Sequence, residues 1–183
     1  MTKQQQIKFL QWFIIALFCK FMLLDIIPEM MWLRSFLAYI ALFKCVTYVK
    51  ELKRVNFYIG AGLLLLISGF FIDSPFLAVW HFVLIGGIDL LIIIMLGQQI
   101  IRIEQQYRTK GKMSELFISY QWGVLLLLAG WTFKMNVSVS TWTFLLFVGV
   151  LVLFVVQIRL LIHTHRLKKH IRFSMQTVTF PKK

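Results

Sequence analysis

Two ionisable residues, Asp89 and Lys20, stand inside long apolar stretches of the sequence. Asp89 lies near the middle of residues 80–102, and Lys20 interrupts residues 7–27. A charge at the centre of a membrane-spanning helix costs about 2.5 to 3.5 kcal/mol on insertion scales, so such residues usually have partners. Opposite charges at matched depth relieve this cost for one another. The pattern therefore favours a Lys20–Asp89 ion pair, which is either purely architectural or part of a proton or ion pathway.

The helix that carries Asp89 is expected to pack against other helices on the side of that carboxylate. Gly86, Ile93 and Gly97 lie three, four and eight positions from Asp89 and share its helical face. Glycines let a neighbouring backbone approach closely. This side of the helix is therefore predicted to face a bundle and not lipid.

Composition places the whole chain in a membrane. Its 183 residues are 60% hydrophobic, whereas soluble domains contain about 45 to 50% apolar residues. The net charge of +13 comes from bases that flank apolar stretches, which is typical of cytoplasmic loops and argues against nucleic-acid binding. Cys19 and Cys45 fall within predicted spans and form no disulfide framework or metal motif. The apolar run that follows Lys3 and Lys8 has no small-residue cleavage site and is interpreted as an uncleaved first span.

The pattern predicts an all-α polytopic membrane protein with six transmembrane helices arranged as three sequential hairpins. A bundle over residues 1–163 is followed by a basic cytoplasmic tail at 164–183. A spanning helix needs about 20 mostly apolar residues. The predicted spans cover approximately residues 7–27, 30–49, 55–72, 76–101, 116–133 and 142–162.

The distribution of bases predicts that both chain ends are cytoplasmic. Of the 20 Lys and Arg residues, 17 fall on the side that holds the two ends, and only Arg34 and Lys134 fall on the other side. Cytoplasmic loops are enriched in these residues. Tryptophans gather at the opposite interface, where amphipathic rings anchor a helix: Trp32, Trp80, Trp131 and Trp142.

Other polar residues offer two candidate sites. A solute or proton path through the bundle would use Lys20, Asp89, Gln121 and Gln157, although interhelical hydrogen bonding is the commoner role of such glutamines. Gln157 shares a face with Gly149 and Leu153, which marks the packed side of the sixth span. An outer mouth would use Asp25, Arg34, Asp73 and His81, and the alternative is a solvated rim of charges.

The sequence predicts no catalytic residues, no metal site and no cofactor. His163, His165 and His170 are common types of metal ligand, but the surrounding bases repel cations and instead suit anionic lipid head groups at the cytoplasmic face. No hydrolase, metalloprotease or phosphate-binding motif is present, so we do not expect an enzyme.

Two functional hypotheses follow. The first is a small transport component that binds or conducts a small solute or proton through the polar path. The second is a non-catalytic accessory or regulatory subunit that docks on a larger membrane complex or signalling protein through residues 102–112 and 164–183. Both place the chain as a multi-pass protein of a cell membrane, and residue usage suggests a bacterium.

Overall fold

The computed structural model describes residues 1–21, 28–107, 109, 111–132 and 138–176, and these residues contain helices and no strand. The α-helices, in chain order, are α1 (Lys3–Phe21), α2 (Pro28–Thr47), α3 (Val55–Ser68), α4 (Pro75–Gln106), α5 (Met113–Thr132) and α6 (Val139–Gln176). Two short 3-10 helices, η1 (Lys50–Leu52) and η2 (Gly69–Phe71), precede and follow α3. The predicted all-helical fold class is therefore confirmed for the described residues.

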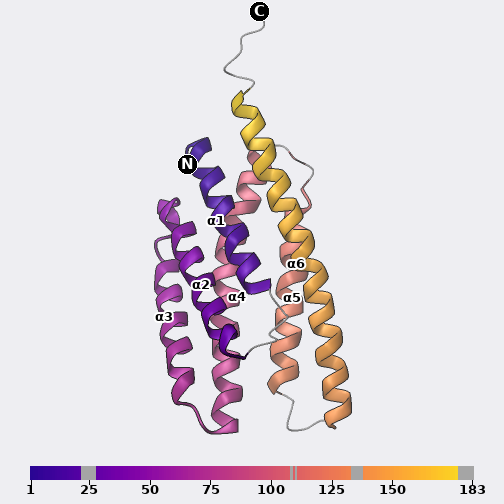
Figure 1. Ribbon diagram of the computed structural model, residues 1–183. Helices are drawn as coiled ribbons and strands as arrows, with labels where there is room; N and C mark the ends of the chain where they lie inside the picture. The colour runs from indigo at the N-terminus through magenta and orange to yellow at the C-terminus, as the bar shows by residue number, and fades with distance from the viewer. Residues whose placement is uncertain (22–27, 108, 110, 133–137, 177–183) are drawn as a thin grey trace, which may run out of the picture.

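The helices run up and down beside one another (Figure 1). α1 packs mainly against α2 and α6, while α4 packs against α3 and α5, and α5 also packs against α6. The beginning of α1 and the end of α6 lie at the same end of the bundle, together with the connections from α2 to α3 and from α4 to α5 (Figure 1). We call this the terminal end. The connection from α3 to α4 lies at the opposite end, which we call the far end.

Local sequence explains where the central helix begins. Ser74 precedes α4 with an extended backbone (φ −79°, ψ 125°), and Pro75 occupies the first turn. Proline suits this position because its fixed φ matches a helix and its missing N–H would have had no partner there. α4 then continues for 32 residues and holds Asp89 near its middle.

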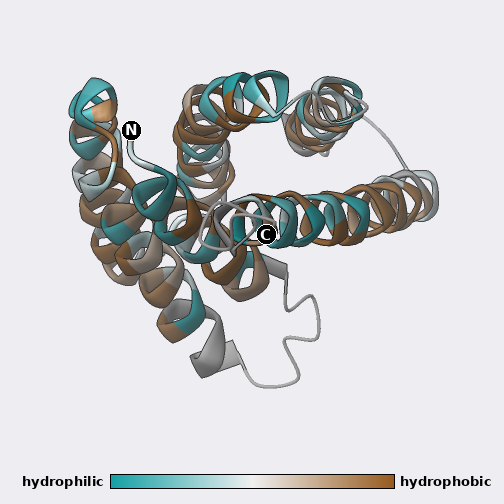
Figure 2. Ribbon diagram, turned by 90° about the horizontal axis from the view of Figure 1, so that it is seen from above, coloured by the Kyte–Doolittle hydropathy of each residue, from teal (hydrophilic) through white to brown (hydrophobic). Residues whose placement is uncertain are grey.

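Three helices are long and apolar enough to cross a membrane. Among the described residues these segments are Phe76–Gln106, Met113–Gly130 and Val139–Ser174, and the apolar segment Val55–Phe71 is shorter. Large apolar side chains cover outward faces, as with Phe57 at 76% and Leu64 at 70% exposure. Seen from above, hydrophobic residues predominate along the helices (Figure 2). Outward apolar surface of this extent suits contact with lipid.

The core draws buried side chains from all six α-helices, α3 included. Phe9, Phe13 and Phe117 are fully buried, and the rings of Phe13 and Phe117 are 6.1 Å apart. A Cβ atom on Gly97 would lie 2.8 Å from the Phe117 ring, and one on Gly86 would lie 2.5 Å from Leu128. The two glycines on the Asp89 side of α4 thus admit side chains of α5, as their spacing predicted.

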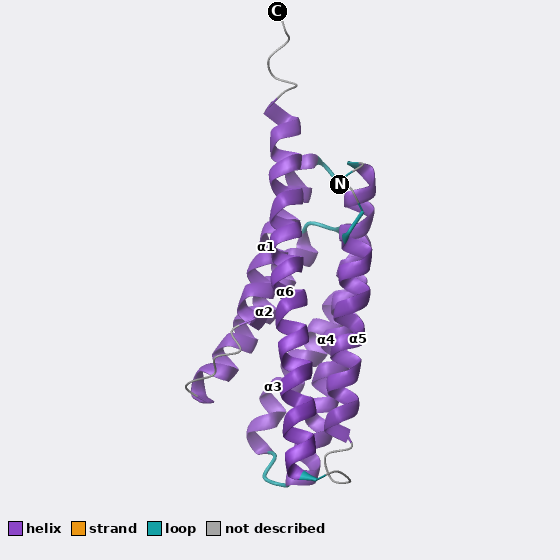
Figure 3. Ribbon diagram, turned by 90° about the vertical axis from the view of Figure 1, so that its right-hand side faces the viewer, coloured by secondary structure: helices purple, strands orange, loops and turns teal. Residues whose placement is uncertain are grey.

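The last helix extends well beyond the span predicted for it. α6 continues to Gln176, whereas the sequence placed the end of the sixth span near Ile162 and treated 164–183 as a tail outside the bundle. Thr164, Leu167 and Ile171 are buried along one side of this extension and continue the line of the buried Leu160. Their spacing of three and four residues forms a helical stripe, and the extension packs on α1 at the terminal end (Figures 1 and 3).

Candidate functional site

Lys20 and Asp89 form an ion pair between the last turn of α1 and the middle of α4. Lys20 Nζ contacts Asp89 Oδ2, and the exposed fractions of the two side chains are 17% and 25%. Both side chains are therefore mostly buried in the bundle, but part of each remains accessible. The Lys20–Asp89 ion pair that the sequence favoured is therefore present. Its role in a solute or proton path stays a prediction.

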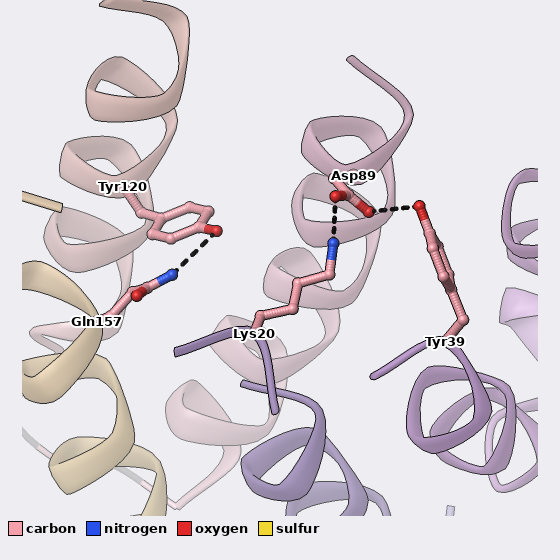
Figure 4. Close-up of polar contacts among 5 residues, drawn as sticks. All are labelled: Lys20, Tyr39, Asp89, Tyr120 and Gln157. Atoms are coloured by element: carbon pink, nitrogen blue, oxygen red, sulfur yellow. Dashed lines mark hydrogen bonds and ion pairs between the residues drawn. The ribbon is translucent and has the colours of Figure 1, made fainter. Parts of the chain in front are cut away.

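Tyr39 of α2 completes this cluster (Figure 4). Its hydroxyl donates a 2.9 Å hydrogen bond to Asp89 Oδ1, and Lys20 Nζ lies 5.2 Å from the centre of its ring. Tyr39 is only 1% exposed. Asp89 therefore has a partner at each carboxylate oxygen, and Lys20 meets both a negative charge and the face of an aromatic ring. We call Lys20, Tyr39 and Asp89 the charged triad.

The position of Tyr39 depends on a glycine of the neighbouring helix. A Cβ atom on Gly62 of α3 would lie 2.5 Å from the Tyr39 hydroxyl oxygen and 2.6 Å from the ring carbon that carries it. Because glycine has no side chain, the ring fits against the α3 backbone with its hydroxyl directed at α4. Sequence reasoning did not identify Tyr39, since its role requires α2, α3 and α4 to be placed together.

A second polar contact joins α5 and α6. Gln157 Nε2 donates to the Tyr120 hydroxyl at 3.5 Å, which is the long limit of a hydrogen bond, and both residues are buried. Gly149 accommodates Leu127 and Gly123 accommodates Leu153, so the predicted packed face of α6 is the one that meets α5. Gln121 is half-buried beside Tyr120 in the chain, and its side chain forms no hydrogen bond within the described part of the structure. No direct bond links this contact to the charged triad among the described residues (Figure 4).

Three of the four residues proposed for an outer mouth lie in the described part, and their grouping into one site stays a prediction. Asp25 lies outside the described residues. The Nε2 atom of His81 is 2.6 Å from the backbone carbonyl oxygen of Leu65, so this ring joins α4 to α3. Asp73 is exposed just before α4, and Arg34 is half-buried on α2.

Buried polar residues at the terminal end were missed by sequence reasoning. Gln6, 3% exposed, donates to Gln106 Oε1 at 2.9 Å and accepts from the Tyr107 hydroxyl at 2.8 Å. The Tyr107 ring in turn lies edge-on to His170, with ring centres 6.4 Å apart. These contacts fix α1, α4 and α6 to one another. Gln6 was overlooked because it precedes the apolar run and resembles a residue of a solvated end.

Glu104 links α4 to the start of α5. Its Oε2 atom accepts from the Met113 backbone N–H at 3.2 Å, and the residue is 6% exposed. A carboxylate at the beginning of a helix satisfies a free N–H group and is favoured by the helix dipole. The sequence placed Glu104 in a hydrophilic connector and gave no sign of this contact.

The described residues contain no group of three His, Cys, Asp or Glu side chains placed to hold a metal ion. Comparison with protein families, with curated proteins and with solved structures found no match.

Proposed function

We propose that the chain is a six-span protein of a cell membrane with both ends in the cytoplasm. Three helices have the length and apolarity for crossing, and the other three lie alongside them in the same bundle. Among the described residues, the terminal end carries Lys3 and Lys8, the bases of residues 50–54 and those of α6 beyond Ile162, which matches the enrichment of Lys and Arg on the cytoplasmic side. Trp80 near the start of α4 and Trp142 near the start of α6 suit the opposite interface.

We further propose that the protein is a transport component that binds or conducts a small solute or a proton at the charged triad. The observation that carries this proposal is the Lys20–Asp89 ion pair inside an apolar bundle, with both side chains still partly accessible. Ionisable residues at such positions mark ion paths or proton relays in many membrane proteins.

The triad offers a simple proton-dependent step. A proton taken up by Asp89 removes its negative charge and weakens its attraction for Lys20. Lys20 sits in the last turn of α1, so the loss of its partner frees the end of that helix. The Tyr39 hydroxyl already donates to Oδ1 of this carboxylate and can keep that hydrogen bond when Oδ2 takes up the proton.

Proton flux into liposomes containing the purified full chain tests this function. An entrapped pH-sensitive dye reports flux after a potassium diffusion potential is imposed. The wild type should acidify vesicles faster than protein-free liposomes, and Asp89→Asn should abolish the difference. Glu115→Gln is the control, because it also converts a carboxylate to an amide but at an exposed position outside both candidate sites.

The comparison of wild type with Asp89→Asn also distinguishes a transport role of the ion pair from a purely structural one. Equal flux in wild type and Asp89→Asn, at equal reconstituted amounts, would contradict proton conduction. Parallel uptake of a labelled small-solute panel then tests the solute version, in which Lys20→Met should lose uptake and Lys44→Met, an exposed lysine at the end of α2, should retain it.

A second candidate is an accessory subunit that docks on a larger membrane protein. The specific observation in its favour is the continuation of α6 to Gln176, a helical arm at the terminal end. With the connector 102–112, this arm offers a surface to a partner. Isolation in mild detergent should then yield a stoichiometric companion that is lost when exposed bases of the arm, such as Arg166, are substituted.

A further inference from the structure

A basic groove lies at the terminal end between α1 and α6. It has a volume of about 690 Å³ and is lined by Gln4, Ile7, Lys8, Gln11, His165, Lys168, Lys169, Arg172 and Phe173. We call these residues the basic groove. No carboxylate lines it, and it is distinct from the charged triad, whose members lie deeper in the bundle.

Helical spacing explains why these side chains converge. Gln4, Lys8 and Gln11 follow one another by four and three positions on α1, which places them on one face. On α6, the four polar lining residues follow the same rule. They are His165, Lys168, Lys169 and Arg172. Two helices thus turn a cationic face toward the same space.

The bases of the groove lack carboxylate partners. None of the ion pairs among the described residues involves Lys8, Lys168, Lys169 or Arg172. Lys169 instead lies 5.6 Å from the Phe173 ring centre, and Lys8 lies 5.9 Å from that of Tyr48. Like charges one helical turn apart, such as Lys168 and Arg172, repel one another. A bound anion would relieve this repulsion.

The walls of the groove are held in place from behind. Leu167 and Ile171 are buried on the other side of the α6 extension, and Gln6 of α1 is bonded to Gln106 and Tyr107. The groove is therefore a fixed concave surface, in which several charges act together on one ligand. A flexible basic tail would give only diffuse attraction.

We propose that the basic groove binds a phosphate-bearing anion, and that its occupant is the head group of an acidic phospholipid. Lysine and arginine are the side chains that bind phosphate. The groove also offers Ile7 and an exposed Phe173, which suit the glycerol and upper acyl region of a lipid. At about 1.5 Å per residue, His165 lies about 5 Å past the end of the apolar stretch at Ile162, which is head-group depth. This inference uses the proposed membrane orientation but does not depend on transport by the triad.

Binding of short-chain phosphatidylglycerol to the full chain in nonionic detergent provides the test. Native mass spectrometry or thermophoresis gives the affinity, with short-chain phosphatidylcholine and inorganic pyrophosphate as comparison probes. A variant carrying Lys168→Gln, Lys169→Gln and Arg172→Gln should lower phosphatidylglycerol affinity by about fivefold per lost charge, since a base near an anionic surface contributes about 1 kcal/mol. Phosphatidylcholine should bind weakly to every variant.

A matched control removes three exposed bases from the same end of the bundle. It carries Lys50→Gln, Lys53→Gln and Arg54→Gln, all in the connection from α2 to α3 and outside the groove. This variant should bind phosphatidylglycerol like the wild type. A variant with Lys168→Arg and Lys169→Arg should also bind, because it keeps the charge.

Two outcomes overturn the proposal. Equal loss in the groove variant and the control would show that net charge, and not the groove, attracts the lipid. Binding of pyrophosphate that depends on the groove, without binding of phosphatidylglycerol, would replace the lipid with a soluble phosphate compound. Asp89→Asn should leave lipid binding unchanged, so failure of the groove and failure of transport at the triad are separable.

Discussion

The hydroxyl of Tyr39 reaches Asp89 by passing over the backbone of Gly62. This relationship ties the chemistry of α4 to the packing of α2 on α3, because the hydrogen bond of 2.9 Å exists only where α3 has no side chain. Asp89 thus contacts Lys20 through one carboxylate oxygen and accepts the Tyr39 hydrogen bond through the other. Tyr39 is itself held in place by its fit against Gly62.

Substitution of Gly62 by alanine should destabilise the protein. The new methyl group would overlap the Tyr39 hydroxyl, and overpacking of this kind costs about 1 to 3 kcal/mol. Gly60→Ala is the control on the same helix, because no atom lies within 4 Å of its added Cβ. Its improved helix propensity should stabilise by up to about 1 kcal/mol. Denaturation in mixed micelles, followed by circular dichroism, measures both, and equal stability would contradict the close fit.

Removal of one member of the ion pair should cost more than removal of both. Lys20→Met leaves Asp89 charged without its partner, and breaking a buried pair in this way costs about 3 to 5 kcal/mol. The double variant Lys20→Met with Asp89→Leu should recover much of this stability. The same denaturation assay applies.

The exposed pair between Arg102 and Glu51 supplies the control for this experiment. Its atoms are 3.4 Å apart and its side chains are 68% and 71% exposed. Arg102→Met should therefore change stability by less than about 1 kcal/mol. If Arg102→Met lost as much stability as Lys20→Met, burial of an ion pair would not decide how much the pair contributes to stability.

Counting residues along the apolar stretches was enough to place Lys20 and Asp89 at similar depth and to separate the six helices. It could not identify Tyr39, because a tyrosine within a span contributes apolar surface like its neighbours. Only the three-dimensional placement of Gly62 against its ring shows that its hydroxyl points toward Asp89. The end of α6 was also missed. Bases are frequent in the sequence after Ile162, while the buried stripe that holds this segment in the bundle consists of Thr164, Leu167 and Ile171, spaced among them.

Loss of the Glu104 side chain should loosen the beginning of α5. Glu104→Ala leaves the Met113 N–H without its partner, and loss of a helix cap costs about 0.5 to 2 kcal/mol. Glu115→Ala is the matched control, since this exposed glutamate lies in the first turn of α5 and its carboxylate makes no described bond. Hydrogen exchange over residues 113–117 should rise in the first variant alone.

Substitution of Gln6 by alanine should weaken the junction of α1, α4 and α6. The exposed Gln106 and the half-buried Tyr107 would each lose a bonding partner, at a cost of about 0.5 to 1.5 kcal/mol per hydrogen bond. Gln11→Ala, at an exposed position on the same helix, should be nearly neutral. Thermal unfolding in detergent measures the difference, and unchanged melting of Gln6→Ala would argue against the network.

Single cysteines should reveal which end of the bundle faces the cytoplasm. In a background with Cys19→Ala and Cys45→Ala, Asp73→Cys should react with an impermeant maleimide on intact cells. Arg166→Cys should react only after permeabilisation, because it lies at the terminal end. The reverse pattern would invert the proposed orientation, and labelling of both on intact cells would contradict the six-span arrangement.

The length of α6 has a mechanical consequence. From Leu151 to Gln176 the helix contains no glycine or proline, so it has no joint at which bending would be concentrated. Gln157 inside the bundle and Arg172 in the basic groove therefore lie on one uninterrupted helix and move together. A tilt of α6 would therefore move the wall of the basic groove and the surroundings of Gln157 together, so we expect an anion bound in the groove to be coupled to the helices around Gln157.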